Sequence, residues 1–253
     1  MIFRRSAPSR PAATIPAGER VYAIGDVHGR LDLLEGLLAL IATDDANRAP
    51  AVTTLIFLGD LIDRGSDSAG VVRLVRATAQ AGRFQTRVIK GNHEEVFLLA
   101  ASGDRRAVRA LTEIGGMETM RSFGIADEEA QAGSFADLAD LLSRRLPADD
   151  LAFLETAEDM IHIGDYVFVH AGIRPGVPLS EQDVADLRWI RREFLASNSR
   201  HEKVVVHGHT ISDQVEQLHN RIGVDTGAYA TGRLSAVGLE QGERWTLCFA
   251  HPD

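Results

Sequence analysis

The sequence is short of cysteine, of long apolar runs and of positive charge. Cys248 is the only cysteine among 253 residues, which excludes an internal disulfide and points to no redox compartment. No stretch of about 18 apolar residues is present, so no membrane-spanning helix is predicted. The formal net charge of −9 argues against nucleic acid or an anionic membrane as the main partner, because both select basic surfaces.

The first 19 residues also lack the apolar centre of a secretory signal. They carry arginines and prolines separated by small residues, a composition that predicts an extended or mobile arm. We therefore expect a cytoplasmic protein with a flexible arm over residues 1–19. A single domain is expected over residues 20–253, because α/β domains often reach roughly 250 residues.

From Val21 onward, short apolar strands alternate with amphipathic helices. Strands are predicted over residues 21–24, 53–58 and 87–89. The first is followed by leucines at helical spacing, and the second by a helix that Ser66 or Asp67 can cap and that runs to about Ala81. Three strands within ninety residues, each leading into a helical stretch, favour a parallel α/β sheet.

The rest of the chain divides into a helical part and a second strand-rich part. Residues 95–158 are rich in alanine and leucine, which predicts several helices beside the sheet, either as a structural layer or with a role in substrate choice. The elements predicted after them are strands over 160–163 and 166–169 joined by a Gly164-Asp165 hairpin turn, a helix from Ser180 to about Ala196, a strand over 204–206 and short antiparallel strands to Ala250.

Five segments place Asp, Asn or His beside glycine, and nearly all follow directly on an apolar run. They are GDVHG (25–29), GDLIDRG (59–65), GNHE (91–94), HAG (170–172) and HGHT (207–210). Because α/β folds bind ligands at the carboxyl ends of their strands, these segments are expected to meet at one site. Carboxylates, an amide oxygen and several imidazoles suit borderline-to-hard divalent cations.

The spacing of these residues suits two cations. A pair of divalent ions about 3.5–4 Å apart needs one bridging carboxylate and several further ligands. Asp26 and His28 stand two residues apart beyond one strand and can reach the same ion, while Asp60 at the tip of the next strand is placed to bridge. The residues that could complete the second ion are Asn92, His170 and His209.

The ordered pattern GDxHG, GDxxDRG, GNHE and two later histidines resembles the phosphoprotein phosphatase branch of the calcineurin-like metallophosphoesterases, whose bacterial and phage members are similar in length. The resemblance covers the chain from about Val21 to the C-terminus, and the first three motifs match without a substitution. It implies an α/β fold in which two mixed β-sheets pack as a sandwich flanked by helices.

The resemblance also implies a role for each motif residue. Two divalent metal ions are expected, with manganese favoured and iron or zinc as alternatives. One ion would be held by Asp26, His28 and Asp60, and the other by Asp60, Asn92, His170 and His209. His93 would act as the general acid, oriented by Asp63. The substrate phosphate would be bound by Arg64, Asn92 and Arg191, with Arg188 and Arg192 left open as alternatives to Arg191.

The activity that follows from the resemblance is hydrolysis of a phosphate monoester by direct attack of a metal-bridging hydroxide. The intact Asp63-Arg64 pair favours a serine/threonine protein phosphatase, so the expected partner is a phosphoprotein or a small phosphoester. Symmetric hydrolysis of diadenosine tetraphosphate is the alternative enzyme. A non-catalytic, metal-stabilised interaction module would be marked by loss of a ligand or of His93, and the sequence retains them all.

Three further residues carry expectations of their own. His209 is preferred over His207 as the ligand. In an extended chain both histidines would lie on the same side, which makes His207 a candidate for supporting the ligand. Asp225, in the Asp-Thr-Gly segment, is expected to form a turn, because aspartate side chains readily bond the backbone two residues on.

Overall fold

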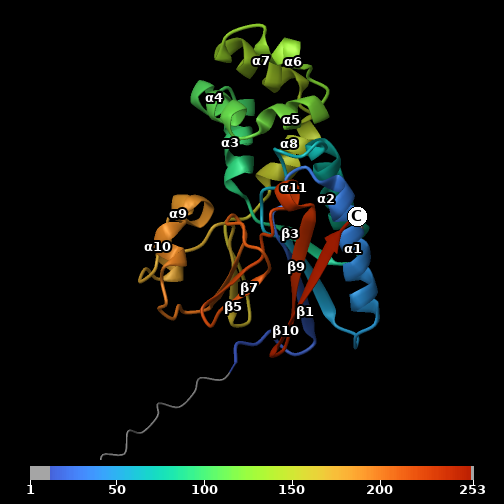
Figure 1. The fold of residues 1–253 in the computed structure, drawn as a ribbon, viewed down its shortest axis with the longest axis vertical. Coiled ribbons are helices and arrows are strands. Elements are labelled where there is room, and N and C mark those ends of the chain that lie inside the picture. Colours follow the sequence, from blue (N-terminus) through green and yellow to red (C-terminus); the bar gives the residue numbers. More distant parts are fainter. Residues whose placement is uncertain (1–11, 252–253) are drawn as a thin grey trace, which may run out of the picture.

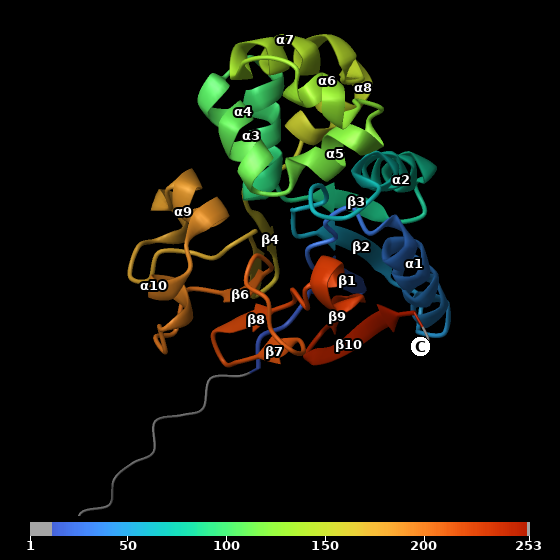
Figure 2. The same cartoon turned by 45° about the horizontal axis from the view of Figure 1, so that its top comes forward.

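The computed structural model describes residues 12–251 as two five-stranded β-sheets packed face to face, with helices on both outer faces and at one end (Figures 1 and 2). The predicted α/β fold with two mixed sheets is therefore confirmed. The expected arm falls largely on residues 1–11, which lie outside the described residues. Ala13 and Ile15 pack between the sheets, and the N–H of Ile15 donates to the carbonyl of Gln241.

The first sheet contains the three strands predicted near the N-terminus. Its order is β10-β9-β1-β2-β3, and β1, β2 and β3 run parallel while β9 is antiparallel to both β1 and β10. The strands are β1 (Glu19–Ile24), β2 (Val52–Phe57), β3 (Gln85–Val88), β9 (Arg233–Glu240) and β10 (Glu243–Ala250). The helices α1 (Leu31–Ala46) and α2 (Ser68–Ala81) cover its outer face (Figure 2), and the side chain of Asp67 caps α2.

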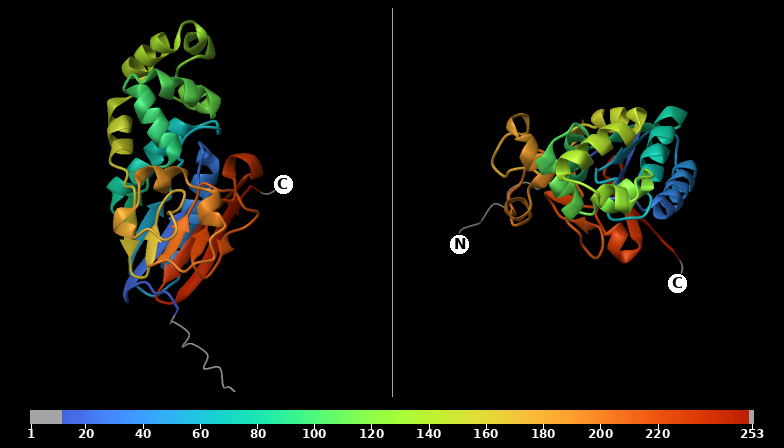
Figure 3. Two further views of the ribbon diagram at one scale, coloured as in Figure 1. Left: turned by 90° about the vertical axis from the view of Figure 1, so that its left-hand side faces the viewer. Right: turned by 90° about the horizontal axis from the view of Figure 1, so that it is seen from above.

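The second sheet is also mixed, with the order β4-β5-β6-β8-β7. Its strands are β4 (Ile161–Ile163), β5 (Tyr166–Phe168), β6 (Val204–His207), β7 (Glu216–Gln217) and β8 (Arg221–Gly223). The hairpin predicted at Gly164-Asp165 is confirmed, because Ile163 pairs with Tyr166 across it. The strands β5, β6 and β8 run parallel, so their carboxyl ends point to the same edge as those of β1 and β2 (Figure 3).

Side chains alternate between the two faces of each strand and thereby divide the core into layers. Val21 and Ala23 of β1 pack between the sheets, while Tyr22 and Ile24 pack against the helices on the outer face. In β5, Val167 faces the outside of the second sheet. Both faces of each central strand are thus buried, which explains why these strands read as continuous apolar runs.

The helical segment predicted over residues 95–158 gathers at the end of the sandwich where the strands deliver their carboxyl ends (Figure 1). It consists of α3 (Asn92–Ala101), α4 (Arg105–Glu113), α5 (Gly116–Ser122), α6 (Asp127–Gln131), α7 (Phe135–Arg145) and α8 (Ala148–Glu155). Its first helix begins at Asn92, so Asn92 and His93 lie in a helical first turn. No helix in the described part of the chain combines the length and the apolar character needed to cross a bilayer.

The continuous helix predicted from Ser180 to Ala196 is wrong. The structure contains a short 3-10 turn (Leu179–Glu181), α9 (Val184–Trp189) and α10 (Arg192–Leu195). The chain is extended at Ile190, with ψ of 142°, and leaves helical geometry at Arg191, with φ of −133° and ψ of −87°. This break lets Leu187, Ile190 and Phe194 all pack on the outer face of the second sheet.

The C-terminal part also differs from the short antiparallel strands expected there. The strands β9 and β10 are eight residues long each, β8 pairs parallel with β6, and a short helix α11 (Ala228–Thr231) precedes β9. Cys248 follows an apolar pattern that predicts a core position, but it is exposed on β10 at the edge of the first sheet.

Candidate dinuclear metal centre

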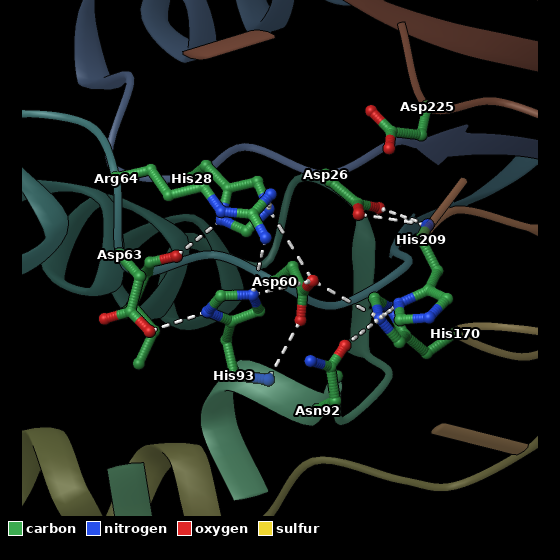
Figure 4. A network of polar contacts seen from close by, with 12 residues as sticks. Asp26, His28, Asp60, Asp63, Arg64, Asn92, His93, His170, His209 and Asp225 are labelled. Carbon is green, nitrogen blue, oxygen red and sulfur yellow. Dashed lines mark hydrogen bonds and ion pairs between the residues drawn. The ribbon is translucent and has the colours of Figure 1, made fainter. Parts of the chain in front are cut away.

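The five sequence segments meet at the carboxyl ends of the strands, beneath the helical segment (Figure 4). Each residue predicted to bind metal is buried, with an exposed fraction of 6% or less. They are Asp26 and His28 after β1, Asp60 after β2, Asn92 at the start of α3, His170 after β5 and His209 after β6. The parallel strands therefore bring together side chains that are up to 183 residues apart in the chain.

Asp60 lies at the centre of the site. Its Oδ2 is 3.4 Å from Nε2 of His170, 3.6 Å from Nε2 of His28 and 3.8 Å from Nε2 of His93. Its other oxygen, Oδ1, accepts a hydrogen bond of 3.2 Å from the backbone N–H of His93. Two groups of possible cation ligands share this carboxylate, one with His28 and His93 and one with His170 and His209. Asp60 thus has the position of a bridging ligand.

Backbone carbonyls orient two of the imidazoles. Nδ1–H of His28 donates to the carbonyl of Ile62 at 2.8 Å, and Nδ1–H of His170 donates to the carbonyl of Leu58 at 2.8 Å. Because a carbonyl can only accept, Nδ1 of each ring carries a proton. Nε2 of each ring then faces Asp60, which is the orientation that metal-binding histidines adopt.

His209 and Asn92 complete the group around His170. Nδ1 of His209 and Oδ1 of Asn92 each lie 3.0 Å from Nε2 of His170. The chain turns sharply at His209, where φ is 63°, so the alternation of an extended strand does not hold between His207 and His209. The ring of His207 packs edge-on against Phe194 with centroids 5.1 Å apart. The chain is therefore not extended at His209, as the expectation for His207 assumed, and a supporting role for His207 stays a prediction.

Asp26 binds the backbone next to these ligands. Its two carboxylate oxygens accept hydrogen bonds of 3.1 and 3.0 Å from the N–H of His209. Asp225 lies beside it (Figure 4), and its Oδ1 accepts a hydrogen bond of 2.8 Å from the N–H of Gly227, which is the predicted turn. The turn also brings a further buried carboxylate to the site.

His93 and Asp63 form a closely bonded pair at the opposite side of Asp60. Nδ1–H of His93 donates to Oδ2 of Asp63 at 2.6 Å, and both residues are buried. Arg64 reaches across from the same loop: its guanidinium nitrogens lie 3.0 Å from Nε2 of His28 and 3.2 Å from Nε2 of His93. The sequence predicted this grouping of His93, Asp63 and Arg64, and the structure brings the three together.

Of the three candidate arginines in residues 188–192, Arg191 contacts the site. Its Nε donates to Nε2 of His209 at 2.9 Å. Arg188 instead forms ion pairs with Asp159 and Glu95, which tie α9 to α3. The break between α9 and α10 is what points Arg191 toward His209.

Burial and mutual interaction shift the pKa values of these groups strongly. Burial raises the pKa of Asp60, but the charges of His170 and His93 outweigh burial and hold it well below its usual value. Burial and the neighbouring Asp225 raise the pKa of Asp26 well above the usual range. Burial also lowers the pKa of His28 to about 3, which keeps its ring neutral and available to a cation at neutral pH.

This donor set fits two divalent cations. Several buried carboxylates lie close together, and one amide oxygen is within reach. Burial lowers the pKa values of His28 and His209, so a neutral imidazole is available in each of the two groups around Asp60. The excess of buried negative charge favours a bound cation, because unpaired buried carboxylates are costly. A set of oxygen and imidazole ligands selects borderline metals such as manganese, iron or zinc.

The backbone of the site is unusually strained. Among the described residues, six that are not glycine have positive φ, and five of them belong to the site: His28, Asp60, Asp63, Arg64 and His209, with φ between 46° and 71°. Such conformations cost of order 1–3 kcal/mol each and persist only where surrounding contacts enforce them.

Two residues at the site had no role assigned from the sequence. Glu94 is fully buried, and its carboxylate accepts hydrogen bonds from the N–H groups of Asp60, Leu61 and Gly91 at 2.8, 2.8 and 2.9 Å. Its place in the GNHE segment was the available signal. Thr119 of α5 contacts Asp63, and no local pattern in the sequence marks it.

Adding a divalent cation is expected to stabilise the fold. Binding at about 100 times the dissociation constant adds about 2.7 kcal/mol, which corresponds to about 5–10 °C in a chain of this size. The melting temperature, measured with EDTA and then with excess Mn²⁺, Zn²⁺ or Fe²⁺, tests this. Asp60→Asn should reduce the shift, while Asp104→Asn, which retains a side chain able to cap α4, should keep it. Equal melting temperatures with EDTA and with all three metals would contradict the site.

Comparison with known proteins agrees with this geometry. A family model described as calcineurin-like phosphoesterase matches residues 19–237. The chain is 26% identical over 232 residues to the asymmetrical bis(5′-nucleosyl)-tetraphosphatase PrpE of Bacillus subtilis, covering 84% of this chain and 87% of that one. It is 28% identical over 226 residues to serine/threonine-protein phosphatase 2 of Escherichia coli, covering 85% and 90%.

A solved structure of a protein thought to be a diadenosine tetraphosphatase has the same fold. It superposes with a TM-score of 0.62 at 23% identity and covers 94% of this chain and 98% of that chain. At this identity the similarity shows the fold alone. The curated relatives include two kinds of phosphoester hydrolase, one named for dinucleotide polyphosphates and one for phosphoproteins.

Proposed function

The chain belongs to the calcineurin-like phosphoesterase family, and from this premise we propose that it is a metal-dependent phosphomonoesterase of the serine/threonine protein phosphatase type. One observation supports this most: the Asp60 carboxylate lies between His28 on one side and His170 on the other, with the His93-Asp63 pair and Arg64 directly beside it. A site of this kind can bind a phosphoryl group and protonate its leaving group at the same place.

The residues that would hold the two cations are those predicted: Asp26, His28 and Asp60 for one, and Asp60, Asn92, His170 and His209 for the other. When bound, a pair of divalent ions supplies an activated water as nucleophile and offsets charge on the phosphoryl oxygens. Glu94 supports this set, because it fixes the backbone of Asp60 through a buried hydrogen bond. Manganese as the native metal and a cytoplasmic location remain predictions.

His93 is proposed as the general acid. Its Nδ1 proton is held by Asp63 at 2.6 Å, so the ring orientation is fixed and Nε2 faces the site. Burial lowers the pKa of His93, but the carboxylates of Asp60 and Asp63 outweigh burial and raise it. The raised pKa supports an imidazolium that can pass its Nε2 proton to a departing alkoxide.

Arg64 and Arg191 are proposed to bind the phosphate oxygens. Both guanidinium groups lie at the site beside ring nitrogens, Arg64 by His28 and His93 and Arg191 by His209. A planar guanidinium donates in parallel to two oxygens of one phosphoryl group, which a lysine cannot do. Asn92 adds a side-chain amide on the side of His170.

The second candidate is hydrolysis of diadenosine tetraphosphate. It is favoured by the name of the Bacillus subtilis relative, an asymmetrical bis(5′-nucleosyl)-tetraphosphatase. The same cation site and His93 serve either substrate, because both reactions break a bond between phosphorus and oxygen. The difference lies in what surrounds the leaving group.

An assay on three substrates separates the candidates. The protein is incubated with p-nitrophenyl phosphate, a phosphothreonine peptide and diadenosine tetraphosphate, each with EDTA or with Mn²⁺. We expect Mn²⁺-dependent release of phosphate from the first two. Release of ADP from the third with no activity on the peptide would favour a symmetrical tetraphosphatase, and release of AMP and ATP an asymmetrical one. If Mn²⁺ gives no hydrolysis, the assay is repeated with Zn²⁺ and Fe²⁺, and no hydrolysis of any substrate with any of the three metals would contradict the proposed function.

A further inference from the structure

The helical segment reaches the site through the side chain of Thr119 on α5. Thr119 is fully buried, and its Oγ1 lies 2.6 Å from Oδ1 of Asp63. A carboxylate can only accept hydrogen bonds, so the hydroxyl proton of Thr119 is directed at Asp63. Fifty-six residues separate the two in the chain, so only the packing of α5 brings them together.

The same hydroxyl oxygen also holds the backbone of Asp63. It accepts the N–H of Asp63 at 2.8 Å, and it lies 2.9 Å from the hydroxyl of Ser68. Because the proton of Thr119 is used on the carboxylate, Ser68 must be the donor in that contact. Asp63 is thus held at its backbone and at Oδ1, and its remaining oxygen faces Nδ1 of His93.

The turn that carries Asp63 depends on such contacts. Asp63 and Arg64 have φ of 71° and 68°, conformations that side chains other than glycine rarely adopt. The helical segment supports this turn at a second point, because the carbonyl of Gly115 accepts the N–H of Arg64 at 3.0 Å. Gly115 itself has φ of 107°, and a Cβ there would lie 2.8 Å from Cγ of Arg64. The helical segment therefore packs directly against the Asp63-Arg64 turn, with no room for a side chain at Gly115.

We propose that Thr119 is a positioning residue for the acid pair: its hydroxyl fixes the Asp63 carboxylate so that Oδ2 meets His93. This inference rests on the proposed function of His93 as general acid. In that step the bond between phosphorus and the leaving oxygen breaks, and the Nε2 proton of His93 moves to that oxygen. Asp63 keeps its bond to Nδ1–H, and Thr119 exchanges no proton. The helical segment thereby contributes to proton donation.

The test compares Thr119→Val with Thr119→Ser on two leaving groups. For a phosphoserine peptide, whose alkoxide needs a proton, kcat of Thr119→Val should fall about 10- to 100-fold, the range for one hydrogen bond to a charged group. KM should stay unchanged, and p-nitrophenyl phosphate, whose leaving group needs little protonation, should be turned over at nearly the normal rate. Thr119→Ser, which keeps the hydroxyl, should have nearly the kcat of the unaltered protein. Thr112→Val, a threonine of α4 that bonds only its own helix, is the matched control.

A double substitution distinguishes positioning from a general structural role. If Thr119 acts through His93, adding Thr119→Val to His93→Asn should not lower kcat for the phosphoserine peptide any further, because the effects of coupled residues are not additive. The proposal would be overturned if Thr119→Val lowered kcat equally on both substrates, or if it lowered kcat by its full factor in the His93→Asn protein. Should Thr119→Val not fold, Thr119→Ala removes the same hydroxyl and is measured in the same way.

The outcomes also separate this inference from the proposed function. If the unaltered protein hydrolyses none of the substrates, the proposed function fails. If it is active, and His93→Asn loses phosphoserine hydrolysis while Thr119→Val keeps it, the proposed function stands and only the role of Thr119 is overturned.

Discussion

Asp60→Asn is expected to lower kcat/KM for p-nitrophenyl phosphate by about 10³-fold or more. Asp60 is the carboxylate shared by both groups of cation ligands, so its loss affects both cations at once. Bound metal contributes several kcal/mol of charge stabilisation in such reactions, and about 1.4 kcal/mol corresponds to a factor of ten in rate. Activity is measured at saturating Mn²⁺, and bound metal is measured after dialysis.

The control for this substitution is Asp104→Asn, which makes the same chemical change at the start of α4, where asparagine also caps. It should keep both activity and bound metal. Asp60→Asn should retain less metal than the unaltered protein while keeping the same circular dichroism spectrum. Full metal content together with near-normal activity would exclude a bridging role for Asp60.

His93→Asn is expected to slow hydrolysis of a phosphoserine peptide by about 10²- to 10⁴-fold, the usual contribution of a positioned general acid. The effect on p-nitrophenyl phosphate should be much smaller, because that leaving group departs with little help from a proton. Bound metal should be retained, since the six predicted ligands remain. Steady-state kinetics on the two substrates measure the difference.

His162→Asn provides the matched control, because His162 is exposed on β4, outside the described cation groups. Loss of metal from His93→Asn would instead show that His93 is a cation ligand. The distance of 3.8 Å between its Nε2 and Oδ2 of Asp60 is compatible with that role. Normal turnover of the phosphoserine peptide would remove the general-acid role.

Most of the site could be predicted because its residues follow strands. A strand that is buried on both faces reads as an apolar run, and the residue after it must lie at the carboxyl end of the sheet. Asp26 and Asp60 are placed by this rule alone. His170 could be placed in the same way, because the hairpin at Gly164-Asp165 fixes the direction of β5.

The errors arose where tertiary packing overrides local pattern. The apolar spacing over residues 184–195 suits a helix, but packing on the second sheet breaks it at Ile190 and turns Arg191 toward His209. The side of the chain on which His207 lies depends on the backbone at His209, where a positive φ cannot be read from local spacing. Thr119 has no signal because its partner is in another segment.

The positive φ values at the site imply a conflict between thermal stability and activity. Glycine or asparagine would relieve the backbone at His28, Arg64 and His209, and each replacement would also remove a side chain that the reaction is proposed to use. A library screened only for survival of heating in EDTA should therefore accumulate glycine and asparagine at these positions, which sequencing of the survivors would measure. If the most heat-stable variants retain all three residues, the contacts of these side chains contribute more stability than the backbone strain removes. If glycine and asparagine do accumulate, the active protein is less stable than its fold allows, because its site residues require strained backbone.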